Sequence, residues 1–251
     1  MPVYTIIPLE VGRFPALDKS VLTYMHGHGE VIPVPIVMWV IKGQDRCFIV
    51  DTGAGNPQRA EKYHRHMEQA ESQRPVRALE KIAVDPRDIE LVFLTHLHWD
   101  HCGNNSLFSR AQFIVQEEEI RYAMSPLPVH AVAYETPAIG ARPLWLETYS
   151  QFNIVRGDQK IVPGISTIHL PGHCPGFQGI RVDTVEGPYI IAGDSVPHYE
   201  NWQGSRHEEH IPPGVHSDLS ECYRSFQKLK ESGAKILPGH DERIFEQGKF
   251  P

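Results

Sequence analysis

Short apolar runs alternate with amphipathic stretches along the chain. The runs 35–40 and 47–50 flank a polar turn at 42–45, a pattern typical of a β-hairpin. Other short apolar runs bounded by polar residues predict further strands. They lie at 89–94, 112–115, 165–170, 180–185, 189–192 and 234–237. A turn at 186–188 separates two of these runs and predicts a second hairpin.

Helical spacing of apolar residues occurs between the predicted strands. It indicates helices within residues 57–83 and from Glu117 onward. A late helix is predicted with Ser217 as its cap and Gly233 as its stop. Its apolar positions are Leu219, Tyr223, Phe226 and Leu229. Since strands, helices and hairpins interleave, the predicted fold class is α/β, in layers and without a purely parallel sheet.

Residues 120–150 interrupt this regularity, because they are rich in proline, alanine and aromatic residues. Segments of this kind form lids and pocket walls, and a packed surface loop is the alternative. The chain has 251 residues, of which 41% are hydrophobic, enough for one complete core. We therefore expect a single domain over residues 1–251, with a lid or pocket segment around 120–150.

The charge of the chain restricts its partners. A net charge of −7 and a pI near 6.1 provide no basic surface for nucleic acid. No apolar run is long enough to span a membrane, and the first ten residues lack the pattern of a secretory signal. The four cysteines form no Cys-x-x-Cys pair. We expect a cytoplasmic protein that binds neither nucleic acid nor membrane, and the sequence leaves open whether it forms a homodimer.

Histidine is the unusual residue, with 15 in the chain, and several follow the predicted strands. Residues 95–103 read Thr-His-Leu-His-Trp-Asp-His-Cys-Gly. In an extended segment we expect His96, His98 and Asp100 to point the same way and His101 to point the other way, toward a second ion. Burying four such residues without a cation is costly, so the motif indicates a metal site. The ligand types suit zinc, iron, manganese or cobalt.

Three more candidate ligands each follow an apolar run and a glycine. They are His173, Asp194 and His240. Cys102 and Cys174 each follow a candidate ligand, and we interpret both as small buried residues rather than as thiolate ligands.

At this point the sequence resembles the metallo-β-lactamase superfamily over nearly its whole length. Asp51-Thr52-Gly53 is similar to the early motif of that family, residues 96–101 to its signature, and the three later candidates to its later ligands. Among the branches, the chain is most similar to N-acyl-homoserine lactone lactonases and related small lactonases. The segments that carry this similarity are 12–22, 170–173, 193–195 and 239–241.

The resemblance implies an αββα sandwich with two mixed sheets, helices outside and two divalent metal ions, Zn²⁺ first among them with Fe, Mn or Co as alternatives. If the ligands of that family are transferred to the matching positions, one ion would be held by His96, His98 and His173, and the other by Asp100, His101 and His240. Asp194 would bridge the ions, and Asp51 would orient a ligand imidazole.

The implied activity is the opening of a lactone ring. The substrate would be an N-acyl-homoserine lactone, as in quorum quenching, or another small lactone such as a pyridine-fused one. Two ions would bind the attacking hydroxide between them, and Asp100 would carry a proton to the leaving alkoxide. The alternatives are an iron-dependent persulfide dioxygenase and a hydrolase of a thioester, a β-lactam or a phosphodiester.

The sequence departs from the lactonase pattern at one position. The lactonases that it resembles have a substrate-binding tyrosine three residues after the bridging aspartate, whereas this chain has Pro197 there. Tyr199 or His198 is a candidate replacement, with an unrelated surface position as the alternative for Tyr199. Trp99 and His26 are the other candidates for substrate contacts; core packing is the alternative for the tryptophan and an exposed loop for the histidine.

Overall fold

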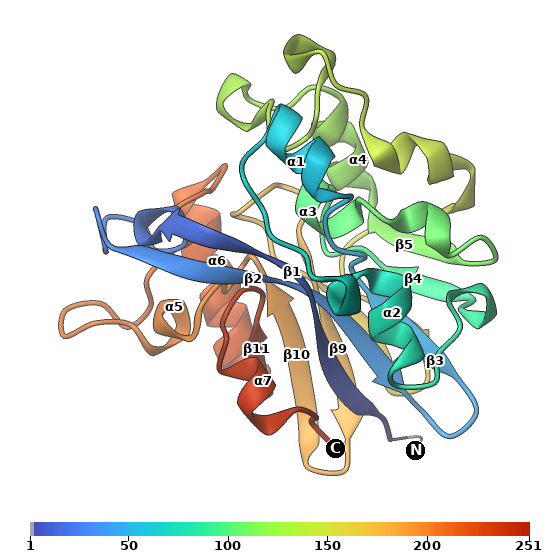
Figure 1. Ribbon diagram of the computed structural model, residues 1–251. Helices are drawn as coiled ribbons and strands as arrows, with labels where there is room; N and C mark the ends of the chain where they lie inside the picture. The colour runs from blue at the N-terminus through green and yellow to red at the C-terminus, as the bar shows by residue number, and fades with distance from the viewer. Residues whose placement is uncertain (1–2) are drawn as a thin grey trace.

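Two β-sheets lie against each other in the computed structural model, which describes residues 3–251 (Figure 1). The first sheet has the order β1 (Thr5–Asp18), β2 (Val31–Lys42), β3 (Cys47–Val50), β4 (Leu91–Phe93), β5 (Gln112–Gln116) and β6 (Phe152–Val155). The second has the order β11 (Lys235–Pro238), β10 (Gly187–Gly193), β9 (Gln178–Thr184), β8 (Ile165–His169) and β7 (Gln159–Val162).

Both sheets are mixed. In the first, β1, β2 and β3 pair antiparallel, whereas β3 to β6 pair parallel. In the second, β7 to β10 pair antiparallel and β10 pairs parallel with β11.

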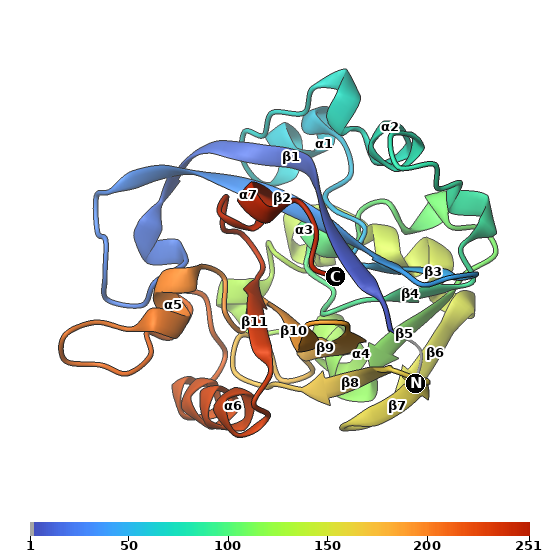
Figure 2. The same ribbon diagram turned by 90° about the horizontal axis from the view of Figure 1, so that it is seen from below.

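Helices cover the outer faces of the sheets. The α-helices are α1 (Pro57–Tyr63), α2 (Pro75–Glu80), α3 (Trp99–Cys102), α4 (Glu117–Met124), α5 (Tyr199–Gln203), α6 (Leu219–Glu231) and α7 (Ile244–Gln247). Figure 2 shows α1 and α2 outside the first sheet and α6 outside the second. The predicted αββα sandwich is therefore confirmed. Within residues 3–251, no helix combines the length and the apolar character needed to cross a membrane.

The alternation of side chains along β2 explains the layers. Val37, Trp39 and Ile41 belong to a buried cluster that also contains Ile180 and Ile191 of the second sheet, so they face the space between the sheets. The residues that alternate with them pack in a larger cluster with side chains of α1 and α2. They are Ile36, Met38 and Val40. Both faces of the strand are buried, as its continuous apolar sequence predicts, and each such side chain contributes about 1.5 to 3 kcal/mol.

Both predicted hairpins are confirmed, with Trp39 opposite Val50 in the first and Gly187 opposite Thr184 in the second. The cap predicted for the late helix is wrong by one residue. The side chain of Asp218 accepts the hydrogen bond of the Glu221 amide, whereas the Ser217 hydroxyl donates to the carbonyl of Gly172.

Three strands were not predicted: β1, β6 and β7. Pro8, Gly12 and Pro15 interrupt the apolar pattern of β1, and its pairing with β2 is irregular at two places. β1 is an edge strand of its sheet, where proline is tolerated because one side of the strand makes no ladder.

The segment 120–150 consists of the end of α4 followed by three 3₁₀ turns, η5 (Pro128–His130), η6 (Pro137–Ile139) and η7 (Leu144–Gln151). Tyr134 and Trp145 from this segment are buried in the larger core. The backbone amide of Trp99 donates to the carbonyl of Ala133, so the segment is attached directly to the histidine motif. Its role as a lid stays a prediction.

Candidate metal centre

The topology brings all the predicted ligands to one edge of the sandwich. Parallel strands end at the same edge of a sheet, and β4 lies parallel to β3, while β10 lies parallel to β11. β8 runs in the same direction as β10, because both pair antiparallel with β9. The predicted ligands follow the ends of β4, β8, β10 and β11. Segments far apart in sequence therefore meet there.

The structure assembles the seven predicted ligands into two groups whose ligand atoms lie within 4.8 Å of one another. The first group is His96, His98, His173 and Asp194, and the second is Asp100, His101 and His240.

Asp194 stands between the two groups and directs a different carboxylate oxygen to each. Its Oδ2 lies 3.6 Å from Nε2 of His173 and 4.0 Å from Nε2 of His96. Its Oδ1 lies 3.1 Å from Nε2 of His240 and 3.4 Å from Nε2 of His101. Two ligands at about 2.1 Å from one tetrahedral ion stand about 3.4 Å apart, so these distances are those of ligand pairs around two ions.

One expectation from the spacing is wrong. An extended segment was expected to direct His96, His98 and Asp100 together, but the chain turns into the short helix α3 after His98. The turn moves Asp100 to the side of His101, with Oδ2 of Asp100 3.9 Å from Nε2 of His101. The expectation that every second side chain points the same way therefore holds only for His96 and His98.

The residues fit a metal-binding role. Nε2 of His96, Nε2 of His101 and Oδ1 of Asp194 are buried and have no hydrogen-bond partner within the described residues. Orphaned buried polar atoms are costly, and a cation in their midst would satisfy them. Burial also lowers the pKa of His96 and His98 well below the usual value, which favours the neutral imidazole that binds metals.

Asp51 links the end of β3 to the motif. Its carboxylate accepts hydrogen bonds from the amide and hydroxyl of Thr95, both at 2.7 Å, and lies 2.8 Å from Nδ1 of His101. The contact fixes the ring so that Nε2 of His101 faces Asp194. Asp51 adopts a left-handed backbone with φ of 57°, unusual for a residue other than glycine.

Backbone carbonyls orient two other imidazoles. Nδ1 of His173 lies 2.8 Å from the carbonyl of Val215, and Nδ1 of His240 lies 2.8 Å from the carbonyl of Pro35. In both rings Nε2 is thereby left facing Asp194. A side chain at Gly239 would not fit, because a Cβ there would lie 2.9 Å from Oδ1 of Asp194.

Glu119 is a residue of this site that sequence reasoning missed. Its side chain is fully buried and accepts hydrogen bonds from the amide of Leu97 at 2.9 Å, the hydroxyl of Tyr134 at 2.7 Å and the thiol of Cys174 at 2.9 Å. It thus joins the loop of the first histidines to the loop of His173. The available signal was its position beside the apolar residues of α4, on the face that is buried.

A cavity of about 100 Å³ opens onto the ligands. His98, Asp100, His173, Asp194 and His240 form its polar side. Its apolar wall includes Phe14, Leu17, Val21, Leu22, Val34 and Trp99. This wall comes largely from β1, β2 and the turn between them, so the strand that was not predicted supplies part of the cavity.

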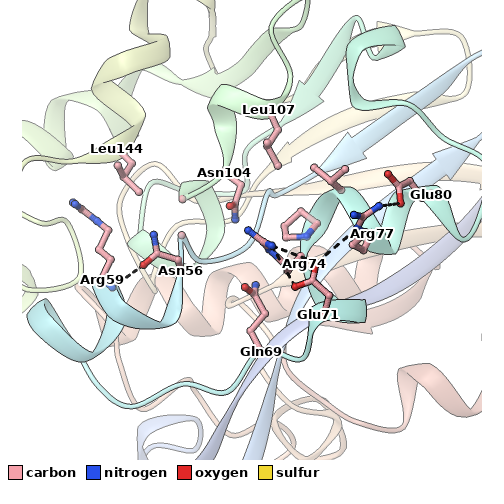
Figure 3. A pocket seen from close by; sticks show the side chains of 14 residues that line it. Asn56, Arg59, Gln69, Glu71, Arg74, Arg77, Glu80, Asn104, Leu107 and Leu144 are labelled. Carbon is pink, nitrogen blue, oxygen red and sulfur yellow. Dashed lines mark hydrogen bonds and ion pairs between the residues drawn. The ribbon is translucent and has the colours of Figure 1, made fainter.

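A larger hollow of about 670 Å³ lies elsewhere and contains none of the seven predicted ligands (Figure 3). Its arginines are paired, Arg59 with Glu135, Arg74 with Glu71 and Arg77 with Glu80. Since this hollow offers neither orphaned ligands nor a free cation among these pairs, we place the chemistry at the smaller cavity.

Of the predicted substrate contacts, the structure brings only Trp99 to the cavity. His26 lies 2.6 Å from Oε2 of Glu208, away from the cavity lining. The other two candidates pack near the residue after His240. His198 Nε2 lies 3.1 Å from Asp241, and the Tyr199 ring lies under the guanidinium of Arg243 at 4.8 Å.

Comparison with known proteins supports the assignment of the family. The model of the metallo-beta-lactamase superfamily matches residues 31–240. An N-acyl homoserine lactonase from Bacillus sp. is 28% identical, with 90% of this chain and 88% of that protein covered. The N-acyl homoserine lactonase AttM of Rhizobium radiobacter is 30% identical over 65% of this chain and 62% of its own length.

Solved structures share the fold. An N-acyl homoserine lactone hydrolase with N-hexanoyl-L-homoserine at its catalytic metal centre superposes with a TM-score of 0.79 at 24% identity, covering 98% of this chain and 97% of that one. AidC, a dizinc quorum-quenching lactonase, gives a TM-score of 0.72 at 13% identity, covering 96% and 91%.

Proposed function

Since the chain belongs to the metallo-β-lactamase superfamily, we propose that it is a hydrolase that uses two divalent metal ions to open a lactone ring. The observation that carries this proposal is the position of the Asp194 carboxylate, because its two oxygens face two separate groups of histidines. A carboxylate placed in this way is suited to bridge two ions.

The lactone substrate is proposed from two observations. The relatives that cover most of the chain are N-acyl homoserine lactonases. The cavity of about 100 Å³ is smaller than the roughly 150 Å³ cavity that holds a benzene molecule, so it has room for a small ring at most, and a longer substituent would extend outside. We propose an N-acyl-homoserine lactone or another small lactone, with quorum quenching as the role and the cytoplasm as the location.

Each ion would take three ligands besides the shared Asp194. The proposed ligands are His96, His98 and His173 for one ion and Asp100, His101 and His240 for the other. Nitrogen and oxygen donors without a thiolate make Zn²⁺ the first candidate. When bound, the ions supply Lewis acidity toward the lactone carbonyl and a nucleophile derived from water at neutral pH.

Side chains of the protein would transfer the proton and exclude water. Asp100 lines the cavity and its side chain is 15% exposed, so it can take the proton that the attacking nucleophile releases and pass it to the alkoxide that leaves the ring. The apolar wall with Phe14 and Trp99 excludes water from the carbonyl that reacts. Cys102 and Cys174 are fully buried, and burial raises the pKa of both thiols well above the usual value, so neither is suited to act as a nucleophile.

The test is the metal content of protein purified without added metal, combined with hydrolysis assays on homoserine, aliphatic and aromatic lactones. We expect about two divalent ions per chain and ring opening of at least one lactone class, lost on chelation and restored by Zn²⁺. A single iron per chain, oxygen consumption with a persulfide and no hydrolysis would contradict the proposal.

A further inference from the structure

Arg65 is a cation at the cavity that has no partner of opposite charge among the residues that the structure describes. It lines the cavity, its side chain is exposed, and no carboxylate of residues 3–251 lies within 4.0 Å of its guanidinium. Its guanidinium carbon lies 5.5 Å from the centroid of the Phe14 ring. Because Arg65 is exposed while it lines the cavity, it marks the rim where the cavity reaches solvent.

The backbone that carries Arg65 is fixed by the preceding residue. The imidazole of His64 stacks on the indole of Trp99, with 4.0 Å between centroids and 2° between planes. Nε2 of His64 also lies 3.1 Å from Oε1 of Glu135, which accepts a hydrogen bond from Arg59. Arg65 therefore begins at a defined place relative to Trp99, which stands between two predicted ligands.

Phe14 connects the same elements on the other side. Its ring lies 5.7 Å from the ring of Trp99, and the guanidinium of Arg65 lies over it. A flat guanidinium on an aromatic ring keeps the donors at its edge free for a ligand. Apart from the predicted ligands, the other residues that line the cavity are apolar. Arg65 is therefore the one lining side chain that carries a permanent positive charge.

The positive charge of Arg65 contrasts with the net negative charge of the chain. The net charge of −7 disfavours the approach of anions to the chain as a whole, whereas the unpaired guanidinium of Arg65 attracts an anion at the rim of the cavity. Because the cavity has room for a small ring at most, a longer substituent would extend past the rim. A guanidinium binds a carboxylate there through two parallel hydrogen bonds.

We propose that Arg65 determines specificity by pairing with a carboxylate on the substituent of the lactone, so that the preferred substrates are small lactones with an anionic substituent. The proposal rests on the proposed lactonase function and narrows its substrate class.

The experiment compares two lactones of similar size, N-succinyl- and N-pentanoyl-homoserine lactone, which differ by a carboxylate in place of a terminal ethyl group. The wild-type protein should prefer the succinyl compound. Arg65→Gln should lower kcat/KM for that compound about 10-fold, mainly through KM, and leave the pentanoyl compound within about two-fold. Arg65→Lys should keep part of the preference. Rising salt should weaken the preference in the wild type.

Arg110 provides the matched control, because it is exposed, is absent from the cavity lining and has no ion pair within residues 3–251. Arg110→Gln should leave both substrates unchanged. Equal changes with both lactones in Arg65→Gln, or no change with either, would overturn the role of Arg65 while the lactonase function stands. If wild-type protein with two ions opens neither these nor other lactones, the proposed function itself fails, and the substrate class with it.

Discussion

The thiol of Cys174 donates a hydrogen bond to Oε2 of Glu119 at 2.9 Å, directly beside the predicted ligand His173. The other carboxylate oxygen of Glu119 accepts from the amide of Leu97, which lies between His96 and His98. One buried side chain on α4 thus connects two loops that carry ligands proposed for the same ion.

We expect Glu119→Gln to weaken metal retention. Glutamine has one acceptor oxygen, and its amide group would face a donor, so at least one hydrogen bond is lost at a cost on the order of 1 to 3 kcal/mol. The measurement is metal content after dialysis against a graded chelator, together with thermal unfolding. Glu118→Gln is the control, because Glu118 is exposed on the same helix. Unchanged metal retention in Glu119→Gln would show that the two loops hold their positions without this carboxylate.

Asp194→Asn should reduce occupancy at both metal positions. The amide nitrogen cannot act as a ligand, so one of the two histidine groups loses its shared partner. We expect turnover to fall by at least about 100-fold. Elemental analysis and single-substrate kinetics check this, and full activity with two ions would remove Asp194 from the bridging position.

Tyr199→Phe tests the sequence-based candidate for the missing tyrosine. The structure places Tyr199 beside the inter-sheet core and outside the cavity lining, with its ring under Arg243. We therefore expect kcat and KM to stay within about two-fold of wild type. A clear rise in KM in Tyr199→Phe would instead return this residue to the list of substrate contacts.

The four thiols should differ in reactivity. Burial raises the pKa of Cys222 to about 12, so below that pH the thiol stays protonated and unreactive. Cys102 and Cys174 are fully buried, whereas Cys47 is partly exposed. Brief treatment with a maleimide at pH 8 should label Cys47 first, as mass spectrometry would show. Unfolded protein should take four labels, and Cys47→Ser should remove the fast one. Equally rapid labelling of Cys222 in folded protein would contradict its burial.

The ligand candidates could be predicted because each follows a short apolar strand. The residue types of these candidates are visible in the local sequence. Their grouping around two ions came from the resemblance to the metallo-β-lactamase superfamily. The direction of Asp100 could not be derived from spacing, because it depends on where the extended segment turns into α3. That turn includes a backbone hydrogen bond between Trp99 and Ala133, a contact between segments far apart in sequence.

The cavity wall was beyond sequence reasoning for a different reason. Phe14, Val34 and Val215 come from separate parts of the chain and meet only through tertiary packing. The prolines and glycine of β1 concealed the strand that carries Phe14, since an edge strand tolerates residues that a central strand excludes. The fold class was accessible from the pattern, whereas the shape of the cavity depends on pairing between distant strands.

The left-handed backbone of Asp51 limits which residues position 51 can accept. Glycine would adopt this φ with less strain but offers no acceptor to Thr95 and His101, and most other side chains would resist the conformation. Asparagine tolerates the backbone yet keeps only one acceptor oxygen for partners that use both. Random mutagenesis of this codon should therefore return aspartate almost exclusively among fully active clones, so that position 51 has nearly no neutral variation.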